Sequence, residues 1–520
     1  MTEHRPTAPL NAADLILGPT LARGEGDNVA ILCGDQQTTF AALDAAASRF
    51  GGALRPHLRR GDRVLLLLRD SPDFIAAYLG VIRVGGVAVA LNTRLAARDL
   101  AFAITDSEAE VCIVEEEFAS LLGEATTVAG RTPRLVVMRG GAAPGTTRLD
   151  DLLAAAPAVV ESAPMSADDM AFWLYTSGTT GLPKAAIHCH GDVLAGDQYM
   201  AFFGLKPGER VFSSSKLFFA FSLGHTLLGG LRAGATIILY EGWPDAQAIA
   251  EVVERYRPTV MLSVPTFFRN LLRDGFARRP AFAEVRHYLS AGEALPESLY
   301  ERWLEDTGRP IVEGIGATET IFMMVSGTPA DHRPGATGKP MPYADVRLLD
   351  EQDRPVTEVG EIGVLWARLP SLCRGYWKQP DKTAAAFRDG WFRTGDVFSI
   401  DAAGWWSHHG RGDDLLKISG QWVSPGEIEE CAASVPGVVE AAVVGVHNDD
   451  GLVRVALFVV GEEDGDADLA DAVRSKLLST LSVYKCPRNI TFVDAIPRTA
   501  TGKIQRYKLR QMAAEMKAPA

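Results

Sequence analysis

Residues 171–184 read AFWLYTSGTTGLPK, a short apolar run that leads directly into a loop of glycine and hydroxyl residues. The apolar run has the length and composition of a buried strand, so we expect the loop to lie at a strand end. Backbone N–H groups, hydroxyls and a lysine are groups that wrap phosphate oxygens. The loop therefore predicts a phosphate site made by Thr176, Ser177, Gly178, Thr179, Thr180 and Lys184.

Two other interpretations of this loop compete with the phosphate site. A nucleotide-binding P-loop requires GxxxxGK[ST], but Lys184 follows Pro183 and precedes Ala185, so that pattern is absent. A surface turn rich in glycine and threonine is the simpler alternative, and the bare composition allows it. The whole nonamer TSGTTGLPK is more specific than its composition and favours the phosphate site.

On both sides of the loop, short apolar runs alternate with helix-like stretches. Ser71–Ile82 has helical spacing behind a Ser-Pro start signal and lies between two strand-like runs, Arg63–Leu68 and Val87–Leu91. Further strand-like runs are Arg210–Ser213, Thr236–Leu239, Val260–Ser263 and Val285–Leu289. This alternation is typical of α/β proteins with mostly parallel sheets. We expect a large N-terminal α/β domain, several mostly parallel sheets with helices, over residues 1–412.

Around Asp396 the sequence becomes rich in glycine and charge, and a second pattern of elements follows. The elements expected there are helices at Glu427–Ser434, Asp468–Leu481 and from Tyr507, and strands at Val438–Val446 and Val453–Val460. They predict a small mobile α+β C-terminal domain over residues 413–520, which is the usual size of a domain.

Composition restricts the class of protein. The 520 residues are 47% hydrophobic and 22% charged, which fits a globular chain with sizeable cores. The formal net charge of -13 argues against broad binding to nucleic acid or anionic membranes. Six scattered cysteines without metal-ligand spacing predict buried or free thiols. Without a signal peptide or a membrane-spanning run, we expect a cytoplasmic protein.

Motifs in a fixed order along the chain point to one family. After TSGTTGLPK come Gly314–Glu319 (GIGATE), Gly390–Asp396 (GWFRTGD), Gly410–Gly420 (GRGDDLLKISG) and Pro497–Arg506 (PRTATGKIQR). From about Thr39 to the end, the chain resembles the acyl-adenylate-forming superfamily, which includes acyl- and aryl-CoA ligases, luciferases and peptide-synthetase adenylation domains. It departs from the common family pattern at Ile315, where tyrosine is usual.

The resemblance implies an ATP-dependent acid–CoA ligase, which forms an acyl-adenylate and then passes the acyl group to coenzyme A. Thr318 would contact the nucleotide phosphate, and Glu319 would hold Mg2+, a hard cation that prefers carboxylate and phosphate oxygens. Asp396 and Arg411 would bind the ribose hydroxyls. The remaining ATP/AMP site is expected at Ala291, Gly292 and Glu293 of the turn SAGEALP (Ser290–Pro296) and at Gly314, Ile315, Gly316 and Ala317.

The same resemblance makes Lys503, within PRTATGKIQR, the expected catalytic lysine of adenylation, together with Thr176, Thr318 and Glu319. Negative charge builds on the phosphoryl oxygens in this step, so cations and hydrogen-bond donors around the phosphate stabilise it. Asp413 stands at the family's hinge, where the small domain is expected to swing and withdraw Lys503 after adenylation.

The expected coenzyme A site belongs to the C-terminal part. Gly420, next to Ser419, would let the pantetheine arm pass close to the backbone. Lys417 is on the same loop and would support either the second half-reaction or the acyl-adenylate. Lys485 and Arg488 form a basic patch that is a candidate for the 3'-phosphate, although exposed basic residues more often are only solvated.

Two segments are expected to line the acid. Lys216–Gly224 reads KLFFAFSLG and resembles the KLFFAYGLG-type segment of benzoate-CoA ligases, and Thr320–Met324 follows the GIGATE box. Those benzoate enzymes are expected to have Tyr-Gly at Phe221-Ser222 and histidine at Phe322, so the pocket should be more apolar here. Such a wall suits a small aromatic acid, disfavours a para-hydroxyl, and favours benzoate or 2-aminobenzoate (anthranilate). The expected acyl pocket is Phe219, Ala220, Phe221, Gly316 and Phe322.

Other interpretations stay open. Phenylalanine runs usually are core, and a stand-alone aryl-acid adenylating enzyme would load a carrier protein instead of free coenzyme A. Amino-acid-selecting members would need an aspartate near Phe221, which Lys216–Gly224 lacks. No feature requires a luciferase-like oxygenase. A silent binding module is opposed by intact Lys184, Glu319, Asp396, Arg411 and Lys503. Both a monomer and a homodimer fit the sequence.

Overall fold

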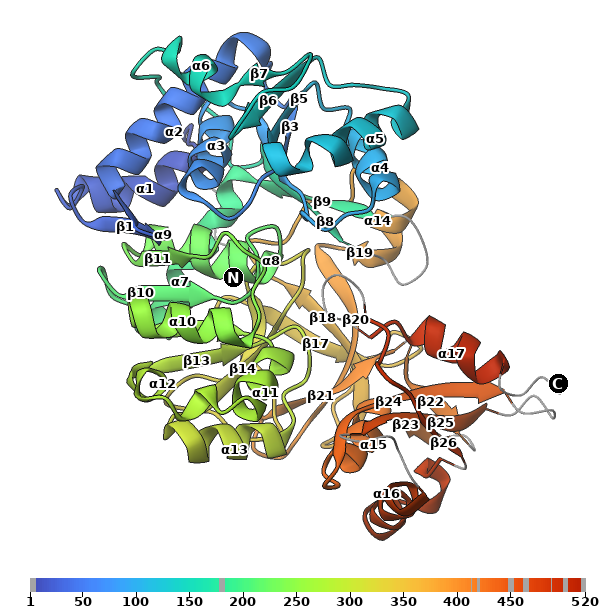
Figure 1. Cartoon of the computed structure of the whole chain (residues 1–520). Helices are drawn as coiled ribbons and strands as arrows, with labels where there is room; N and C mark the ends of the chain where they lie inside the picture. Colours follow the sequence, from blue (N-terminus) through green and yellow to red (C-terminus); the bar gives the residue numbers. More distant parts are fainter. Residues whose placement is uncertain are drawn as a thin grey trace.

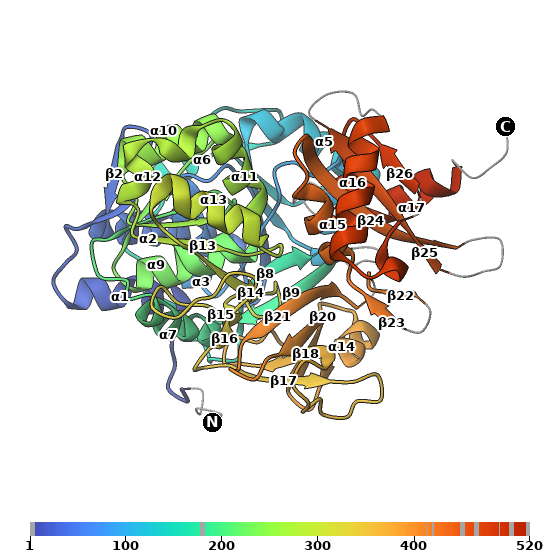
Figure 2. The ribbon, with the colours of Figure 1, turned by 90° about the horizontal axis from the view of Figure 1, so that it is seen from below.

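The computed structural model describes residues 6–176, 183–412, 414–418, 421–447, 453–461, 467–487, 489–498 and 504–515. Two large sheets and a smaller third sheet form the N-terminal part, and the C-terminal part lies beside them (Figures 1 and 2). The expected α/β fold with a smaller C-terminal domain is confirmed.

The first large sheet has seven strands, parallel except for the edge strand β9. Their order is β7 (Thr147–Arg148), β6 (Leu135–Arg139), β5 (Val111–Glu115), β3 (Arg63–Leu67), β4 (Val87–Ala90), β8 (Met170–Thr176) and β9 (Lys184–Cys189). The phosphate-loop sequence connects β8 to β9 at one edge of the sheet, as the apolar run before it predicts.

The second large sheet has nine strands. Their order is β16 (Lys339–Pro340), β15 (Met323–Ser326), β14 (Ile311–Gly316), β13 (His287–Ser290), β12 (Val260–Ser263), β10 (Arg210–Ser213), β11 (Thr236–Leu239), β1 (Val29–Cys33) and β2 (Gln36–Thr39). The strands from β14 to β1 are parallel, and β2, β15 and β16 are antiparallel additions at the edges. The GIGATE box therefore forms the end of β14 and the turn that leads to β15.

Helices separate and cover the two sheets. Between them lie α1 (Ala12–Ala22), α2 (Phe40–Leu54), α3 (Pro72–Arg83) and α9 (Gly229–Arg232), whose buried residues share one core with both sheets. The outer faces carry α4 (Ala97–Ser107) and α5 (Ala119–Ala129) on one sheet and α10 (Ala246–Tyr256), α11 (Pro265–Arg273), α12 (Pro280–Glu284) and α13 (Glu297–Thr307) on the other.

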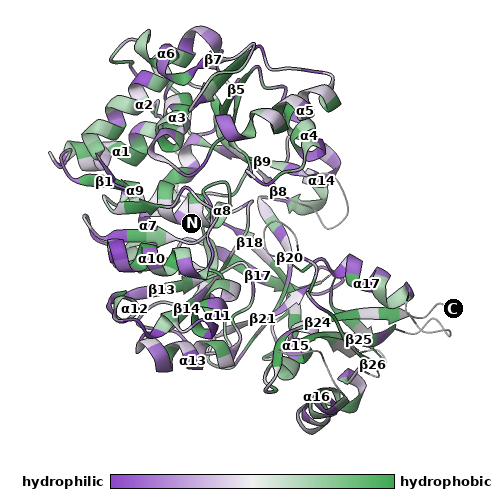
Figure 3. Ribbon diagram, in the orientation of Figure 1, coloured by the Kyte–Doolittle hydropathy of each residue, from purple (hydrophilic) through white to green (hydrophobic). Residues whose placement is uncertain are grey.

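The alternation of side chains along each strand explains these layers. In β3, Val64 and Leu66 belong to the core between the sheets, whereas Leu65 and Leu67 belong to the outer core. A strand buried on both faces is continuously apolar, and Figure 3 shows hydrophobic residues along the central strands. Three further helices of the N-terminal part are α6 (Leu149–Ala154), α7 (Ala195–Phe202) and α14 (Pro380–Ala386).

The third sheet is antiparallel and lies against the ends of the large sheets. It contains β17 (Asp345–Leu349), β18 (Ile362–Arg368), β20 (Trp391–Ile400) and β19 (Phe387–Arg388), with β21 (Trp406–Arg411) paired to β20. The expectation of mostly parallel sheets therefore holds for the two large sheets, and this sheet is the exception, because β20 and β21 are joined directly as a hairpin.

The C-terminal part is an α+β unit. Its sheet is β24 (Val438–His447), β25 (Val453–Gly461) and β26 (Asn489–Phe492), and a separate hairpin is β22 (Leu416–Ile418) with β23 (Gln421–Val423). One face of the sheet packs on α15 (Pro425–Ala433) and α16 (Ala467–Thr480), and the other face packs on α17 (Arg506–Glu515). The domain boundary after residue 412 and the mobility of this unit stay predictions.

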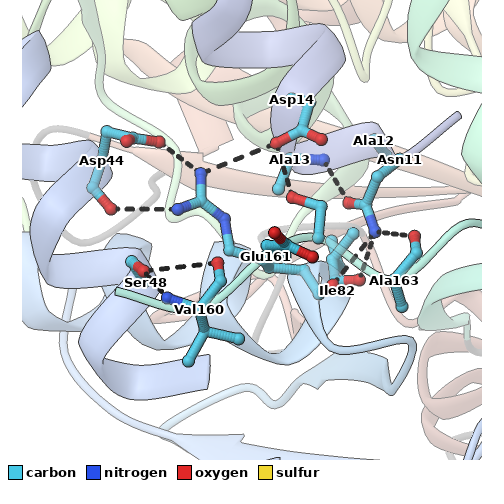
Figure 4. A network of polar contacts seen from close by, with 12 residues as sticks. Asn11, Ala12, Ala13, Asp14, Asp44, Ser48, Ile82, Val160, Glu161 and Ala163 are labelled. Carbon is cyan, nitrogen blue, oxygen red and sulfur yellow. Dashed lines mark hydrogen bonds and ion pairs between the residues drawn. The ribbon is translucent and has the colours of Figure 1, made fainter. Parts of the chain in front are cut away.

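A buried polar network fixes the N-terminal helices around α3 (Figure 4). Asn11 accepts a hydrogen bond from Ala13 N, and its amide nitrogen donates to the carbonyls of Ile82, Arg83 and Ala163. The guanidinium of Arg83 pairs with Asp44 and lies 3.7 Å from Asp14. Nη1 and Nη2 of Arg83 are both paired at the end of α3, and these partners offset part of the cost of its burial.

The cysteines and the helices of the described residues can be compared with what the composition predicts. All six cysteines are free, and all but Cys486 are buried, as the scattered spacing predicts. Burial raises the pKa of the Cys112 thiol to about 12, which keeps it protonated and unreactive at neutral pH. Among the described residues, no helix combines the length and apolar character that crossing a bilayer requires.

Candidate functional site

The ends of β8 and β9 hold the two described residues of the phosphate loop that the sequence singles out. Thr176 and Lys184 are paired across this hairpin, which fixes where the loop leaves and returns. Ser177, Gly178, Thr179 and Thr180 lie outside the described residues. The ammonium of Lys184 lies 4.1 Å from the ring centroid of Tyr376. Burial lowers the pKa of Lys184, and the nearby Glu319 carboxylate opposes that shift.

Glu319 is the buried carboxylate of the site, with 7% of its surface exposed. The hydroxyl of Tyr376 donates to its Oε1 across 2.6 Å. The three side chains of Lys184, Tyr376 and Glu319 therefore form one cluster, although they come from β9, the segment after β18 and the turn after β14. This cluster combines a cation, a hydroxyl and an anion at the edge where the phosphate loop begins.

The donor set around Glu319 suits Mg2+ in one particular way. Among the described residues, no group of three or more histidine, cysteine, aspartate or glutamate side chains is placed to hold a metal ion. Mg2+ is commonly held by one or two carboxylates together with substrate phosphates and water. A single carboxylate beside a phosphate loop fits that pattern.

The GIGATE box is shaped by close backbone approach between β14 and the segment that follows it. A Cβ at Gly314 would lie 2.8 Å from Ser326 Oγ, and one at Gly316 would lie 3.0 Å from the Phe322 carbonyl oxygen. Ala317 N donates to Thr320 Oγ1 across 2.9 Å and closes the turn. Both glycines therefore allow the close approach with which β15 returns beside β14. Ile315 is half-buried between them.

The turn SAGEALP lies beside the GIGATE strand, because β13 and β14 are parallel neighbours. Gly292 has a φ of +89°, a conformation that disfavours side chains. Glu313 of β14 accepts hydrogen bonds from Leu295 N (3.0 Å) and Thr337 Oγ1 (2.9 Å). Burial raises the pKa of Glu313, and these two donors oppose that rise. Glu313 thereby connects both segments expected to bind the nucleotide.

The two residues expected at the ribose lie opposite each other in the third sheet. Asp396 and Arg411 are register partners in β20 and β21, with Nη1 and Oδ2 3.4 Å apart. His408 Nε2 lies 3.4 Å from the other carboxylate oxygen of Asp396. Arg411 Nη1 also donates to the Thr394 carbonyl across 2.9 Å. The sequence motif predicts the first pair but gives no signal for His408.

The segment expected to line the acid forms a distorted helix. Ala220–Ser222 (α8) continues into a π-helical stretch, Leu223–Leu228, which is an uncommon geometry that occurs frequently at functional sites. Phe219 and Phe221 are half-buried, and Phe322 is fully buried. A Cβ at Gly224 would lie 2.7 Å from the Ile321 carbonyl oxygen, so this helix contacts the segment after Glu319 directly.

Strain marks the segment that carries Phe322. Ile321 has a φ of +60°, which is rare for a β-branched residue, and Phe322 N donates to the Thr320 carbonyl across 2.6 Å. Such conformations persist where the surroundings enforce them, and they cluster at functional sites. The tight turn brings Phe322 against the residues that follow Phe221.

His225 joins the two phenylalanines of the expected acyl pocket. Its ring is edge-on to Phe221 and Phe322, with centroid distances of 5.4 and 5.5 Å. Nδ1 lies 2.8 Å from the Phe221 carbonyl oxygen, which can only accept, so Nδ1 carries the hydrogen. Burial lowers the pKa of His225 to about 4, so the ring is neutral at pH 7 and Nε2 is an acceptor. An imidazole thus packs against both phenylalanines of the pocket that is expected to be apolar.

The C-terminal part contacts the site through PRTATGKIQR. Arg498 Nη1 lies 3.2 Å from Glu293 Oε1 in the SAGEALP turn, and Glu297 N donates to Glu430 across 2.9 Å. Lys485 pairs with Glu427 at 2.7 Å. Outside the residues that the structure describes lie Lys503, Asp413, Ser419, Gly420 and Arg488, and also the side chain of Lys417.

Four residues that contact residues of the expected binding sites were not predicted from the sequence: Tyr376, His408, His225 and His188. Tyr376 contacts Glu319 over a separation of 57 residues, and His188 contacts the Thr318 carbonyl over 130. Because these partners are so far apart in the sequence, no local pattern of spacing could predict the contacts. The one local signal is at His225, four residues after Phe221, because such a pair shares a helix face.

Comparisons with known proteins are consistent with this geometry. Residues 20–377 match the AMP-binding enzyme family, and residues 427–503 match the AMP-binding enzyme C-terminal domain. The chain is 50% identical over 509 residues to a 3-hydroxybenzoate–CoA ligase of Aromatoleum sp. (strain CIB), with 97% of both chains covered. It is 49% identical over 516 residues to a 3-hydroxybenzoate–CoA/4-hydroxybenzoate–CoA ligase of Thauera aromatica, with 98% of both covered. The solved anthranilate CoA ligase AuaEII, in complex with anthranoyl-AMP, superposes with a TM-score of 0.93 at 33% identity, with 99% of both chains covered.

Proposed function

The chain belongs to the AMP-binding enzyme family and is an acid–thiol ligase of the aryl-CoA type, and we propose that its acid is a hydroxylated benzoate, with 3-hydroxybenzoate preferred. Benzoate and 2-aminobenzoate, which the sequence favours, are the competing substrates. The observation that carries the choice is His225, an imidazole acceptor in contact with both Phe221 and Phe322.

The reaction consists of two displacements. A carboxylate oxygen of the acid attacks the α-phosphorus of ATP, the bond to the bridging oxygen breaks, and pyrophosphate leaves. The coenzyme A thiol then loses its proton and its sulfur attacks the acyl carbon, so that a thioester forms and AMP leaves. Both steps build negative charge on oxygen, which donors and cations stabilise.

The nucleotide is assigned to the residues around the β8–β9 hairpin. Lys184 and Thr176 would contact the phosphates together with the loop 177–180, and Thr318 would add its hydroxyl. Glu319 would hold Mg2+, which supplies charge neutralisation on the phosphates when bound. The support for this assignment is the cluster of Lys184, Tyr376 and Glu319 beside the hairpin.

The base and ribose are assigned to the SAGEALP turn, the GIGATE strand and the paired strands β20 and β21. Ala291, Gly292 and Glu293 would face the adenine, with Gly314, Ile315, Gly316 and Ala317 on its other side. Asp396 would accept hydrogen bonds from the ribose hydroxyls, because Arg411 and His408 already orient its two carboxylate oxygens. Lys503 would stabilise the phosphoryl charge during adenylation, and Asp413 would be the hinge for its withdrawal.

The acid is assigned to the space bounded by Phe219, Ala220, Phe221, Gly316 and Phe322. An aromatic ring there would pack on phenylalanine faces and edges. The acceptor Nε2 of His225 can receive a phenolic O–H, which would otherwise lose its hydrogen bond in a dry pocket at a cost of about 1–3 kcal/mol. Lys417, Ser419, Gly420, Lys485 and Arg488 stay candidates for coenzyme A.

The test is an acid panel with pyrophosphate release and thioester formation measured separately. We expect kcat/KM for 3-hydroxybenzoate to exceed that for benzoate and 2-aminobenzoate by about ten-fold, the equivalent of one satisfied hydrogen bond. Repeating the panel with a carrier protein in place of coenzyme A identifies the acceptor. A higher kcat/KM for benzoate than for every hydroxylated ring would contradict the role of His225.

A further inference from the structure

His188 is a buried histidine that connects the phosphate-loop hairpin to the GIGATE turn. It lies on β9, four residues after Lys184, and its side chain is fully buried. Nε2 lies 2.9 Å from the Thr318 carbonyl oxygen, and Nδ1 lies 3.0 Å from Asp192 Oδ2. The hydrogen bond from His188 therefore crosses from the seven-stranded sheet to the segment that follows β14 in the nine-stranded sheet.

The direction of this hydrogen bond follows from its acceptor. A carbonyl oxygen can only accept, so Nε2 of His188 must carry a hydrogen. Asp192 orients the other ring nitrogen, and the same carboxylate oxygen also accepts from Cys189 N across 3.0 Å. The ring plane is fixed by stacking on Phe172, with centroids 5.0 Å apart and planes at 11°. His188 is thus held on three sides.

In the turn after β14, the consecutive carbonyl oxygens of Thr318, Glu319 and Thr320 each accept a hydrogen bond from a residue outside the turn. His188 holds Thr318 O, Cys373 N donates to Glu319 O across 2.8 Å, and the Ser371 hydroxyl donates to Thr320 O across 2.6 Å. The second and third donors come from the segment after β18. Among these donors, His188 alone belongs to the strand that begins at Lys184.

We propose that His188 is a positioning residue for ATP, which keeps Thr318 and Glu319 at a fixed distance from the phosphate loop. The proposal rests on the proposed function, because it takes Thr318 and Glu319 as contacts of the nucleotide phosphates and Mg2+. Positioning matters here because phosphoryl transfer depends largely on geometry, and small displacements of contact groups reduce its rate strongly.

Two substitutions separate the hydrogen bond to Thr318 from the rest of the environment. A glutamine amide nitrogen can occupy about the position of Nε2, so His188→Gln retains a donor to the Thr318 carbonyl. An asparagine amide reaches only about the position of Nδ1, so His188→Asn retains a contact to Asp192 and loses the bond to Thr318. Both variants keep a neutral amide in the same buried place.

The measurement is the dissociation constant of ATP by titration calorimetry, with and without Mg2+, and the KM values for ATP and for the acid. We expect His188→Asn to weaken ATP binding in the presence of Mg2+ and raise the KM for ATP by about ten-fold, the equivalent of one buried hydrogen bond. His188→Gln should stay within about three-fold of the wild type. The KM for the acid should change in neither variant.

His190→Asn, just after the end of β9, is the matched control. His190 is also fully buried, but its Nδ1 accepts from Ala12 N across 2.9 Å and does not contact Thr318. Because asparagine retains an acceptor, this variant should bind ATP as the wild type does. If His188→Asn does not fold, His188→Phe with Asp192→Asn removes the same donor, keeps the ring on Phe172, and leaves no unpaired buried charge.

Equal weakening of ATP binding by the asparagine and glutamine variants would overturn the proposal, and so would wild-type binding by His188→Asn. The calorimetric result does not depend on which acid is used. An enzyme that binds ATP as described but activates no aromatic acid would therefore contradict the proposed function and leave the role of His188 supported.

Discussion

Arg498 in the C-terminal segment PRTATGKIQR forms an ion pair with Glu293 in the turn SAGEALP, with Nη1 and Oε1 3.2 Å apart. The same guanidinium also pairs with Glu440 of β24. Arg498 therefore connects the sheet of the C-terminal part to a turn of the N-terminal part. The segment expected to supply the adenylation lysine, Lys503, is held next to a turn expected to bind the nucleotide.

Arg498→Ala should slow formation of the aroyl-adenylate more than its conversion to the thioester. The ion pair belongs to the arrangement seen here, in which PRTATGKIQR is beside Glu293, and we expect a loss of about three- to ten-fold for a half-buried pair. The measurement is single-turnover pyrophosphate release without coenzyme A, compared with thioester formation from supplied aroyl-adenylate. Arg474→Ala removes an exposed ion pair within α16 and should change neither step.

Removal of the other charge tests whether the pair itself is responsible. Glu293→Gln leaves Arg498 paired with Glu440, so it should reproduce the selective loss expected for Arg498→Ala. An equal loss in both half-reactions for Arg498→Ala would mean that the contact does not favour adenylation over thioester formation.

Tyr376→Phe should weaken Mg2+ binding while the fold is retained. The substitution removes the hydroxyl that donates to Glu319 across 2.6 Å and keeps the ring beneath the Lys184 ammonium. Loss of a hydrogen bond to a metal-binding carboxylate typically costs at least about ten-fold in metal affinity. Mn2+ binding in the presence of ATP, followed by electron paramagnetic resonance, checks this directly. Unchanged Mn2+ affinity would mean that Glu319 does not bind the metal or that the hydroxyl of Tyr376 does not influence this binding.

His225→Asn should reduce discrimination in favour of hydroxylated rings. Asparagine retains a donor for the Phe221 carbonyl and removes the acceptor Nε2. We expect kcat/KM for 3-hydroxybenzoate to fall by about ten-fold and that for benzoate to stay within about two-fold. Phe322→His is the complementary variant, since it adds a polar group on the facing wall and should favour hydroxylated rings at the expense of benzoate. Parallel losses for both acids in His225→Asn would indicate a purely structural histidine.

Stability should fall on mild acidification because His190 is buried in its neutral form. Burial lowers its pKa from 6.5 to about 4, and its Nδ1 accepts a hydrogen bond from Ala12 N. Below pH 6.5 the unfolded chain binds a proton that the folded chain refuses, so the free energy of unfolding decreases as pH falls towards 4. The maximum effect is about 3 kcal/mol. Urea unfolding between pH 7 and 4.5 should show a smaller pH dependence for His190→Asn; an identical slope would contradict this origin.

Much of the fold could be predicted because strand periodicity is local. The strands at Arg210–Ser213, Thr236–Leu239 and Val260–Ser263 occur with the expected bounds, since apolar runs between turn signals leave little choice. The run at Val285–Leu289 forms a strand only from His287 to Ser290, because Val285 is the C-cap of the short helix α12. No such apolar runs between turn signals predicted the strands of the antiparallel third sheet.

Residues of the site could be predicted only where they belong to a sequence motif. Lys184, Glu319, Asp396 and Arg411 come from motifs, and the structure places Lys184 near Glu319 and Asp396 opposite Arg411. Tyr376 and His188 hold Glu319 and the Thr318 carbonyl through contacts between distant segments. The strained φ of Ile321 depends on the packing of Gly224 against it, which no local propensity encodes.

The most direct test of the two-step account is a single-turnover experiment with ATP, Mg2+ and 3-hydroxybenzoate, to which coenzyme A is added only after a delay. We expect pyrophosphate and enzyme-bound 3-hydroxybenzoyl-AMP at about one per site before the addition, and then conversion of the adenylate with coenzyme A to 3-hydroxybenzoyl-CoA and AMP. Absence of the adenylate before coenzyme A is added, or the same behaviour with a saturated acid of eight carbons and not with any aromatic acid, would contradict it.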